Sequence, residues 1–363
     1  MHIPFQLDAE RQEALRAEID TKRRELVADL GERDTRYIRR VMRVSRLLSI
    51  GGRSLLMFSF FNPYTWIAGV LSLAVAKILE NMEIGHNVMH GQYDWTGDPR
   101  LDSRTYDWDN VCAAQDWKQS HNVKHHDLTN IVGRDPDFGY GVLRLTDAVP
   151  WHRRSRAQLV LGLTTTLIFE WAVGIHDAEP EAVRDGRISF KQFVDRLGAF
   201  GRKLRRQAFK DYLLFPALAL LTGHALGVLA GNALANLIRN IWSAVIIFCG
   251  HFPQQTRIYS IDETANESRG AWYARQIEGS CNIEGGWLLY VMSGYLSHQI
   301  EHHVFPDIPS HRYTEIQPWL KDLCKRYGLQ YNTGSLPRQY WSVVRRVARY
   351  SARPKPATGA LPA

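Results

Sequence analysis

The sequence predicts an all-α integral membrane protein, with four transmembrane helices in two hairpins and a cytoplasmic helical cap that holds a histidine-rich site for two metal ions. Three observations lead to this prediction. Apolar stretches of membrane length recur along the 363 residues. Histidines gather in three clusters outside those stretches, and basic residues precede the stretches in a pattern that gives their orientation.

The apolar stretches are residues 47–61, 64–82, 157–175, 212–230 and 233–250. A bilayer crossing takes about 20 apolar residues, so the first stretch is marginal, because it is short and contains Arg53. Asn62-Pro63 and Gly231-Asn232 have the composition of tight turns. They predict hairpins between neighbouring spans and leave segment 157–175 unpaired.

Segment 157–175 determines whether the chain crosses the membrane four or five times. One metal centre requires all three histidine clusters on the same side, and five crossings would separate the third cluster from the others. Four crossings, with 157–175 interfacial or re-entrant, keep the clusters together, and Glu170 would be costly in hydrocarbon. The basic clusters before the spans are then all cytoplasmic, as the positive-inside rule expects. They are Arg39, Arg40, Arg43 and Arg46, then Arg153, Arg154 and Arg156, then Arg202, Lys203, Arg205, Arg206 and Lys210.

The chain divides into a cytoplasmic amphipathic N-terminal segment (1–46), a membrane domain (47–345) and a disordered Pro-rich tail (346–363). The first segment lacks the apolar core of a signal peptide. Membrane topology and attraction to anionic lipid headgroups explain the formal net charge of +8. Nucleic-acid binding is the alternative for a basic chain, but no nucleic-acid-binding motif accompanies the charge. The four cysteines are expected to be reduced and buried.

Three histidine clusters carry the chemistry. They are GHNVMHGQYDW with His86 and His90, HNVKHHDLTN with His121, His125 and His126, and HQIEHHVFP with His298, His302 and His303. A ninth candidate, His251 in CGHFP, follows the second hairpin as His86 follows the first. Imidazole suits iron, zinc and copper, and the clusters hold no cysteine that would favour thiolate-bound zinc or iron–sulfur chemistry. Ligand type alone therefore leaves the metal open.

The spacing within the clusters predicts which histidines share an ion. On a helix, residues four apart share a face, whereas adjacent residues point about 100° apart. His121 and His125 are therefore expected to bind one ion and His126 a second, and His298, His302 and His303 repeat this pattern. Carboxylates should orient the imidazoles by accepting their outer N–H protons. The candidates are Asp94, Asp98, Asp107, Asp109, Asp135 and Asp137. His311 is a weaker candidate ligand, and His2, His152, His176 and His224 are not expected to bind metal.

With these clusters the chain resembles the membrane fatty acid desaturases, whose members carry HxxxH or HxxxxH, then HxxHH or HxxxHH, then a final HxxHH or QxxHH box around a di-iron site. The likeness runs from about Asn81 to Tyr313. Within the family, GHNVMHGQYDW, HNVKHHDLTNIVGRDPDFGYG and SHQIEHHVFPDIPSHRY are most similar to bacterial acyl-CoA delta-9 desaturases of the stearoyl-CoA type. The resemblance implies iron ligands at His86, His90, His121, His125, His126, His302 and His303.

Two further ligands follow from the same resemblance. His251 is similar to the additional ligand that some relatives place after their last membrane helix. In the third box Gln299 matches the QxxHH form, while His298 supplies a histidine one residue earlier, and on a helix either side chain could reach the metal of His302. His298 is preferred, because imidazole is a stronger ligand than an amide.

The activity that the resemblance implies is O2-dependent introduction of a cis double bond into a saturated acyl chain, with acyl-CoA and the delta-9 position favoured. The chain has no fused haem domain, no iron–sulfur cysteine cluster and no GxGxxG fingerprint. Two electrons must therefore come from a separate ferredoxin, rubredoxin or cytochrome with its reductase. The expected location is a bacterial inner membrane, with the boxes facing the cytoplasm. The basic surface there suits either an acidic carrier or the phosphates of CoA.

Two other functions stay open. A membrane di-iron hydroxylase or alkane monooxygenase shares the histidine-rich architecture but would yield an alcohol. A non-catalytic zinc-binding membrane protein would hold zinc and consume no O2. A bent apolar tunnel is expected to hold the acyl chain, and aromatic residues near the boxes are candidates for its walls, although packing or interfacial anchoring is the commoner role. These are Trp95, Trp108, Trp117, Trp287, Tyr290 and Tyr295.

Overall fold

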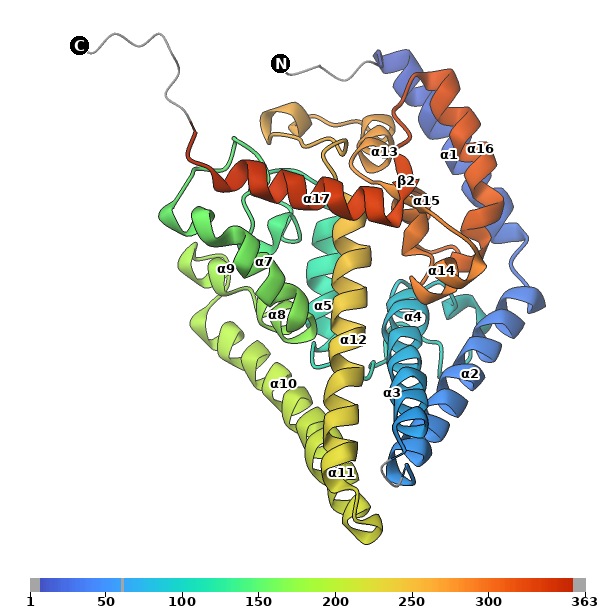
Figure 1. The fold of residues 1–363 in the computed structure, drawn as a ribbon. Coiled ribbons are helices and arrows are strands. Elements are labelled where there is room, and N and C mark those ends of the chain that lie inside the picture. Colours follow the sequence, from blue (N-terminus) through green and yellow to red (C-terminus); the bar gives the residue numbers. More distant parts are fainter. Residues whose placement is uncertain (1–6, 60–61, 355–363) are drawn as a thin grey trace.

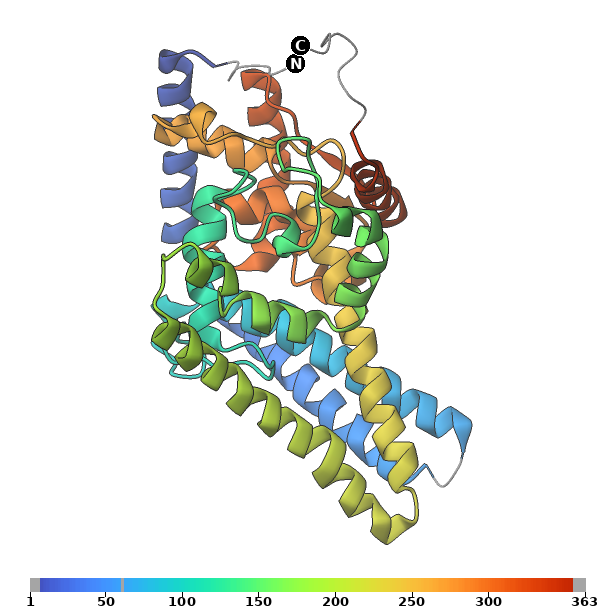
Figure 2. The same cartoon turned by 90° about the vertical axis from the view of Figure 1, so that its left-hand side faces the viewer.

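A computed structural model describes residues 7–59 and 62–354 of the chain, and helices make up most of it. Two long hairpins extend from a cap of shorter helices, which lies at the top of Figure 1. In the view turned by 90°, the long helices slant through the lower half and the cap covers their upper ends (Figure 2). Within the described residues, the all-helical prediction holds except for two short strands.

The first hairpin joins α2 (Glu32–Met57) to α3 (Pro63–Ile78), and its predicted turn at Asn62-Pro63 is confirmed. The Asn62 side chain caps α3 by accepting hydrogen bonds from two backbone N–H groups at 3.0 and 3.3 Å. Proline in the first helical turn needs no N–H partner. The helices approach closely at Gly52, where an added Cβ would lie 2.8 Å from the backbone nitrogen of Leu73.

The second hairpin differs from the prediction. Its first arm runs through α10 (Phe190–Ala208), η6 (Phe209–Leu214), α11 (Phe215–Leu218) and η7 (Ala219–Thr222), and the chain turns at Gly223, where φ is +69°. The second arm is one helix, α12 (Ala225–His251). The predicted turn at Gly231-Asn232, and with it the limits 212–230 and 233–250, is therefore wrong. Gly231 serves packing instead, because a Cβ there would lie 2.6 Å from the Leu56 side chain.

Segment 157–175 forms two helices, α7 (Gln158–Leu167) and α8 (Phe169–His176). The bent pair Arg153–Leu167 and Phe169–His176 turns by 101°, which is the form of a broken span or a re-entrant loop. Glu170 in α8 is buried, and it pairs with Arg239 of α12 and accepts a hydrogen bond from Gln207 at 2.8 Å. A carboxylate paired in this way is a weaker argument against membrane insertion than an unpaired one.

By length and apolar composition, one helix among the described residues, α12, is able to cross a bilayer by itself, and the bent pair is a second candidate. The helix α2 carries several arginines, and α3 changes into a π-helical segment before it reaches membrane length. The four-span arrangement stays a prediction.

The predicted outer limits of the membrane domain both fall inside helices. The N-terminal limit at residue 46 lies within α2, and the segment before it contains a separate helix, α1 (Ala9–Ala28), and the first part of α2. The C-terminal limit at residue 346 lies within α17 (Leu336–Ser351), where Arg346 is buried and donates to backbone carbonyls of Leu145 and Pro253 at 3.0 and 2.7 Å. The predicted disorder is therefore contradicted for residues 346–351, which are helical. Residues 1–6 and 355–363 lie outside the described part of the chain.

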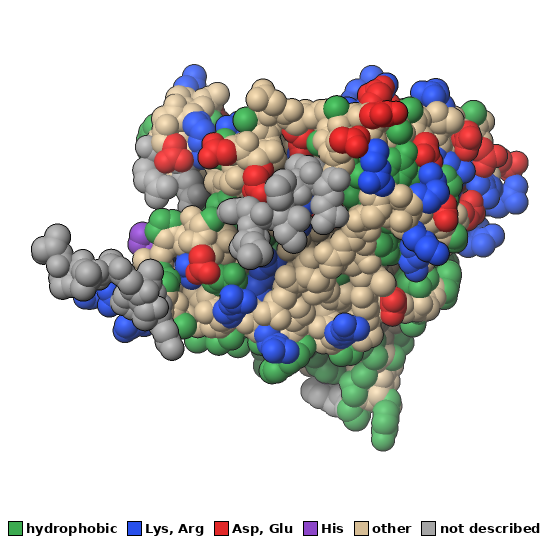
Figure 3. Space-filling model, turned by 90° about the horizontal axis from the view of Figure 1, so that it is seen from above, with side chains coloured by type: hydrophobic (Ala, Val, Ile, Leu, Met, Phe, Trp, Pro, Cys, Tyr) green, Lys and Arg blue, Asp and Glu red, His purple; other side chains and the backbone are tan. Residues whose placement is uncertain are grey.

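The cap packs around a core shared by segments far apart in sequence. Its members are α1, α13 (Arg269–Glu278), α15 (Gln299–Val304) and α16 (Tyr313–Tyr327). The parallel strands β1 (Asn282–Glu284) and β2 (Thr333–Ser335) pair Ile283 with Gly334 beside it. Smaller cap elements are α5 (Ala114–Trp117), α9 (Pro180–Arg184), α14 (Trp287–Met292), η9 (Leu296–His298) and η10 (Ser310–Arg312). Seen from above, acidic and basic side chains spread over the cap face, and hydrophobic side chains gather on the part that projects beyond it (Figure 3).

Two π-helical segments lead into the histidine clusters. They are η1 (Leu79–His86), followed by α4 (Asn87–Met89), and η3 (Lys118–His125), followed by α6 (His126–Leu128). In a π-helix the backbone hydrogen bond joins residue i to i+5, so the face presented by each residue shifts from the α-helical pattern. The four cysteines are all buried and unbridged, as predicted.

Candidate metal centre

Eight of the nine predicted ligands meet in one buried cluster between the cap and the top of α12. His86 and His90 come from η1 and the end of α4, and His251 ends α12. The others come from η3, α6 and α15. Two groups of nitrogen atoms lie within 4.8 Å of one another. The first comprises His86, His90, His121 and His302, and the second comprises His125, His251 and His303.

The inner nitrogens of the first group have no hydrogen-bond partner among the described residues. The Nε2 atoms of His86, His90, His121 and His302 are all buried and unpaired. Buried polar atoms are normally hydrogen-bonded, so four that face one another without partners need an explanation. An ion held between them supplies it, and the donor set fits a metal that accepts neutral imidazole.

The second group brings its Nε2 atoms closer still. The Nε2 atom of His251 lies 3.3 Å from that of His125 and 3.0 Å from that of His303. Nitrogens bound to one ion at about 2.1 Å lie about 3.0–3.4 Å apart, from right-angled to tetrahedral geometry. These spacings therefore match ligands that share an ion.

Six of the clustered imidazoles place the outer nitrogen, Nδ1, against an acceptor. With the proton on Nδ1, the Nε2 lone pair is left for a metal. The acceptors are Asn87 Oδ1 for His86 (3.1 Å), Asp137 for His121 (2.9 Å), Asp135 for His125 (3.0 Å), the Gly279 carbonyl for His251 (3.3 Å), the Tyr313 hydroxyl for His302 (3.3 Å) and Gln276 Oε1 for His303 (2.8 Å). Burial and the neighbouring His121 lower the pKa of His86 to about 3, which keeps it neutral.

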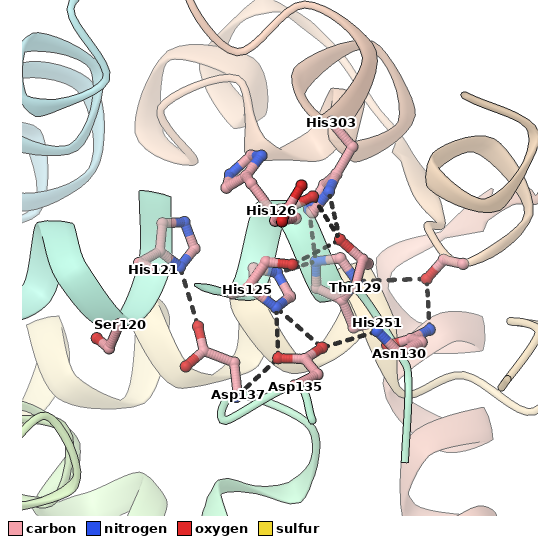
Figure 4. A network of polar contacts seen from close by, with 12 residues as sticks. Ser120, His121, His125, His126, Thr129, Asn130, Asp135, Asp137, His251 and His303 are labelled. Carbon is pink, nitrogen blue, oxygen red and sulfur yellow. Dashed lines mark hydrogen bonds and ion pairs between the residues drawn. The ribbon is translucent and has the colours of Figure 1, made fainter. Parts of the chain in front are cut away.

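Two of the six candidate carboxylates take the orienting role, Asp135 and Asp137 (Figure 4). Asp135 is held by the backbone N–H groups of Asn130 and Asp137 at 2.7 and 2.9 Å, which explains its fixed position. The other four carboxylates serve elsewhere. Asp94 accepts from Ser103, Asp98 pairs with Arg39 and Arg100, Asp107 pairs with Lys203, and Asp109 pairs with Lys210.

A buried glutamine that no sequence pattern marks joins the first and third boxes. Gln92 is fully buried, and its Nε2 atom lies 3.3 Å from Asn87 Oδ1 and 3.1 Å from the Tyr313 hydroxyl. These two atoms are the acceptors for His86 and His302. Its Oε1 atom accepts from the backbone N–H of Ser310 at 2.9 Å. Only its place in GHNVMHGQYDW, two residues after His90, could have indicated this role.

The predicted sharing of ions is only partly reproduced. His302 and His303 fall into different groups, as adjacent histidines were expected to. His121 and His125 fall into different all-histidine groups, but together with Asp137 they form a third group whose ligand atoms also lie within 4.8 Å of one another. They belong to the π-helical segment η3, where i+5 rather than i+4 completes a turn. His126 lies between the groups, stacked on His303 at 4.4 Å and 4.8 Å from His302, and both of its nitrogens are unpaired.

His298 does not join the cluster. It precedes α15 with non-helical φ and ψ of −110° and 53°, so the i−4 relation to His302 is lost. Its ring packs 4.6 Å from that of Tyr290, and its Nδ1 lies 3.2 Å from the Ser297 hydroxyl. Gln299, the less favoured alternative, places its amide nitrogen 2.9 Å from His251 Nε2.

The remaining histidines lie apart from the two groups. His311 pairs with Asp34 at 3.0 Å and stacks on Tyr37. His176 contacts the outer oxygen of Asp137 at 3.4 Å, so it supports His121 indirectly. His152 starts the helix before α7, His224 starts α12, and His2 lies outside the described residues.

A mainly apolar cavity adjoins both groups. Four cluster histidines line it together with Gln299, and these are His86, His121, His125 and His251. Its apolar walls include Met82, Trp108, Trp117, Phe169, Val173, Ile247 and Leu296. Trp117 also stacks on His121 at 4.5 Å. Of the other aromatic candidates, Trp95 and Trp287 are exposed and line no part of this cavity.

Comparison with known proteins gives a consistent result. Residues 64–335 match the family model described as fatty acid desaturase. The chain is 44% identical over 341 residues to a Mycobacterium tuberculosis protein named NADPH-dependent stearoyl-CoA 9-desaturase, covering 93% of this chain and 80% of the relative. It is 25% identical to the sn-1 linoleoyl-lipid 6-desaturase of Synechocystis, over 76% of this chain and 78% of that protein. It is also 27% identical to human fatty acid desaturase 3, over 59% of this chain and 45% of that protein.

Proposed function

Because the chain belongs to the fatty acid desaturase family, we propose that it introduces a cis double bond at the ninth carbon of a saturated long-chain acyl-CoA. It is an oxidoreductase of this family. The name of the mycobacterial relative supports both the CoA carrier and the position of the double bond. The proposal depends on one observation: histidines of both groups, whose Nε2 atoms point toward one another, line the same mainly apolar cavity.

Two iron ions fit the two groups. His86, His90, His121 and His302 would hold one ion, and His125, His251 and His303 the other, with His126 between them. Reduced iron activates O2 to an oxidant strong enough to remove hydrogen from an unactivated methylene, which no side chain can do. The resulting reaction consumes one O2, two electrons and two protons, and yields an alkene and two waters.

The protein's own contribution is to orient ligands and substrate. The acceptors at Nδ1 fix each imidazole in the tautomer that presents Nε2 inward. The apolar cavity walls would align a saturated chain beside His121 and His125 and exclude water from the reacting carbons. The methylenes that lie beside these two imidazoles would then be nearest the ions.

Gln299, rather than His298, is our candidate for the variable ligand of the third box. Its carboxamide reaches His251 Nε2, whereas the His298 ring lies against Tyr290. Its Oε1 atom is buried without a hydrogen-bond partner, so an amide oxygen is available to a metal. The proposed pattern is then the QxxHH form.

We also propose four membrane crossings, formed by the two long hairpins, with the cap in the cytoplasm of a bacterium. Large apolar side chains are exposed near the hairpin turns, including Tyr64 (83%), Leu221 (88%) and Leu226 (80%). Arg53, which made the first span marginal, pairs with the buried Asp211 at 2.9 Å, and Lys77 pairs with the same carboxylate at 2.8 Å. Because these charges are paired, burying them within membrane-spanning helices costs less free energy than burying unpaired charges. Electrons would come from a separate ferredoxin, rubredoxin or cytochrome.

Gas chromatography with mass spectrometry tests the proposal. A desaturase-deficient host would express the chain, the variant His125→Ala, and His152→Ala as a control at a histidine outside the cluster. We expect a new delta-9 alkene, located by derivatisation, from the chain and the control but not from His125→Ala. A hydroxylated product, or an alkene that persists in His125→Ala, would contradict the proposal.

A further inference from the structure

The histidine cluster approaches two different openings. Of the clustered histidines, His90 and His121 are the two that are not fully buried. His121 lines the apolar cavity, which the proposed function assigns to the acyl chain. His90 lines a separate groove on the outside of the protein. The outer groove therefore leads to the histidine cluster from a different side than the cavity proposed for the acyl chain.

The outer groove is formed by the segment after His90 and by the start of η3. Its lining includes Met89, Asp94, Arg104, Lys118, Gln119 and Val123. Val123 is 55% exposed, so an apolar contact point stands beside the polar rim. A small apolar patch with a charged rim is typical of transient protein–protein contacts.

Basic residues predominate around this groove. Arg104 and Lys118 also line an adjoining groove, whose further cations are Arg202, Lys203 and Arg206. The acidic residues of the two grooves are Asp94, Asp107 and Asp116. Asp94 accepts hydrogen bonds from Ser103 and keeps its charge, Asp107 pairs with Lys203, and Arg104 pairs with Asp102 beside the groove. With Asp102 included, the five cations still outnumber the four carboxylates. The surface is thus net positive and suits an acidic partner.

We propose that the groove over His90 is the docking surface for an acidic electron-carrier protein. This inference rests on the proposed function, which needs two electrons that the chain cannot supply. His90 lies 4.7 Å from His126 and 4.7 Å from His302, measured between ring centroids. An electron that enters at His90 therefore reaches ligands of the first group and the imidazole between the groups without crossing the acyl cavity.

The electron balance fixes what the carrier must do. Each turnover oxidises two molecules of a one-electron carrier. Their two electrons, two protons from water and two hydrogen atoms from adjacent carbons of the acyl chain reduce one O2 to two waters. A carrier that docks reversibly must arrive and leave twice in each turnover, so a small, salt-sensitive contact is suitable.

The test compares two sources of electrons for the purified, iron-loaded enzyme. One source is an acidic [2Fe–2S] ferredoxin with its NADPH reductase, and the other is dithionite in a single turnover. The variants are Arg104→Glu, Gln119→Glu and the two combined, because both side chains line the groove and are exposed. Arg24→Glu in α1 is the matched control for Arg104→Glu, since it makes the same charge change outside both grooves.

We expect the double variant to lower kcat/KM for the ferredoxin by about tenfold or more, with a weaker dependence on salt. Its product from a dithionite-driven turnover, and its KM for acyl-CoA, should match those of the wild type and of Arg24→Glu. If the double variant kept the wild-type rate with ferredoxin, the docking proposal would be wrong. It would also be wrong if the double variant changed only the KM for acyl-CoA, by raising it. A wild-type enzyme that accepts electrons from a basic cytochrome but not from the ferredoxin would contradict it as well. Equal losses with both electron sources would also overturn it. Failure of the proposed function would appear separately, as absence of alkene from the wild type with dithionite.

Discussion

Asp137→Asn tests the division of the histidines into two ion-binding groups. One oxygen of Asp137 accepts from His121 Nδ1 at 2.9 Å, and the other lies 3.4 Å from His176 Nε2. Asparagine keeps the shape, and its oxygen can still accept from His121 while its amide nitrogen faces His176. The substitution therefore removes the negative charge and the acceptor that faces His176, but it keeps an acceptor at His121.

The expected magnitude follows from the position of this contact. Loss of a partner that orients a metal ligand costs about 10–100-fold in metal affinity, or about 1.4–2.8 kcal/mol. The loss should fall on the ion held by the group that contains His121. The partners of His125, His251 and His303 are Asp135, the Gly279 carbonyl and Gln276, which this substitution leaves in place. The second ion should therefore be retained.

The assay is a chelator titration of the iron-loaded protein, with bound iron measured by mass spectrometry and the two sites followed by Mössbauer spectroscopy. Asp137→Asn should release one ion at a lower chelator concentration than the wild type and keep the other. Asp135→Asn, the matched variant, should release the ion of the second group first. If each variant released both ions together, or neither released any early, the division into two groups would be wrong.

Three further predictions concern other parts of the structure. Gln299→Leu should weaken iron binding in the same titration, whereas His298→Gln should leave it within about twofold, and the reverse order would restore His298 as the ligand. Hydrogen bonds from Arg312 and His311 lower the pKa of Asp34 although burial opposes this, so the pair stabilises the fold above about pH 4 and the stability is lost as the pH falls further. Asp34→Asn should cost about 3–5 kcal/mol near neutral pH and flatten the acid limb of thermal melts. Gly52→Ala should cost about 1–3 kcal/mol, while its neighbour Gly51→Ala, which meets open space, should not destabilise the protein; equal melting temperatures would contradict the close helix contact.

The sequence predicted well which histidines come together, because their pattern is local and repeated. The three boxes supply seven of the clustered histidines and His251 is the eighth, so the structure brings together eight of the nine candidates. Asp135 and Asp137 were also within reach of sequence reasoning, since they lie shortly after the second box. His298 lies outside the cluster for a local reason: the helix starts at Gln299, so the spacing rule for helices does not apply one residue earlier.

The sequence could not predict contacts that depend on distant segments. Gly231 looked like a turn residue, but it lies inside α12 and leaves room for the Leu56 side chain of another helix. Glu170 looked like an unpaired charge, but Arg239 neutralises it from α12. The acceptors Gln276 and Tyr313 lie in α13 and α16, where no spacing relative to the boxes marks them. In each case tertiary packing, rather than local propensity, decides the role of the residue.

The helix α12 connects the proposed chemistry to the substrate. His251 at its end belongs to the second histidine group, and Ile247, Ser243 and Arg239 line the cavity at successive turns. From Arg239 to His251 a helix rises about 18 Å. Because Arg239 is held by Glu170 and Asn81, and His251 by the Gly279 carbonyl, both ends of this stretch are fixed. The distance between the candidate ligand His251 and Arg239 in the cavity wall is therefore set by the length of α12 between them. The choice of reacting methylene should therefore depend on how the acyl chain is placed along α12, and not on which imidazole binds which ion.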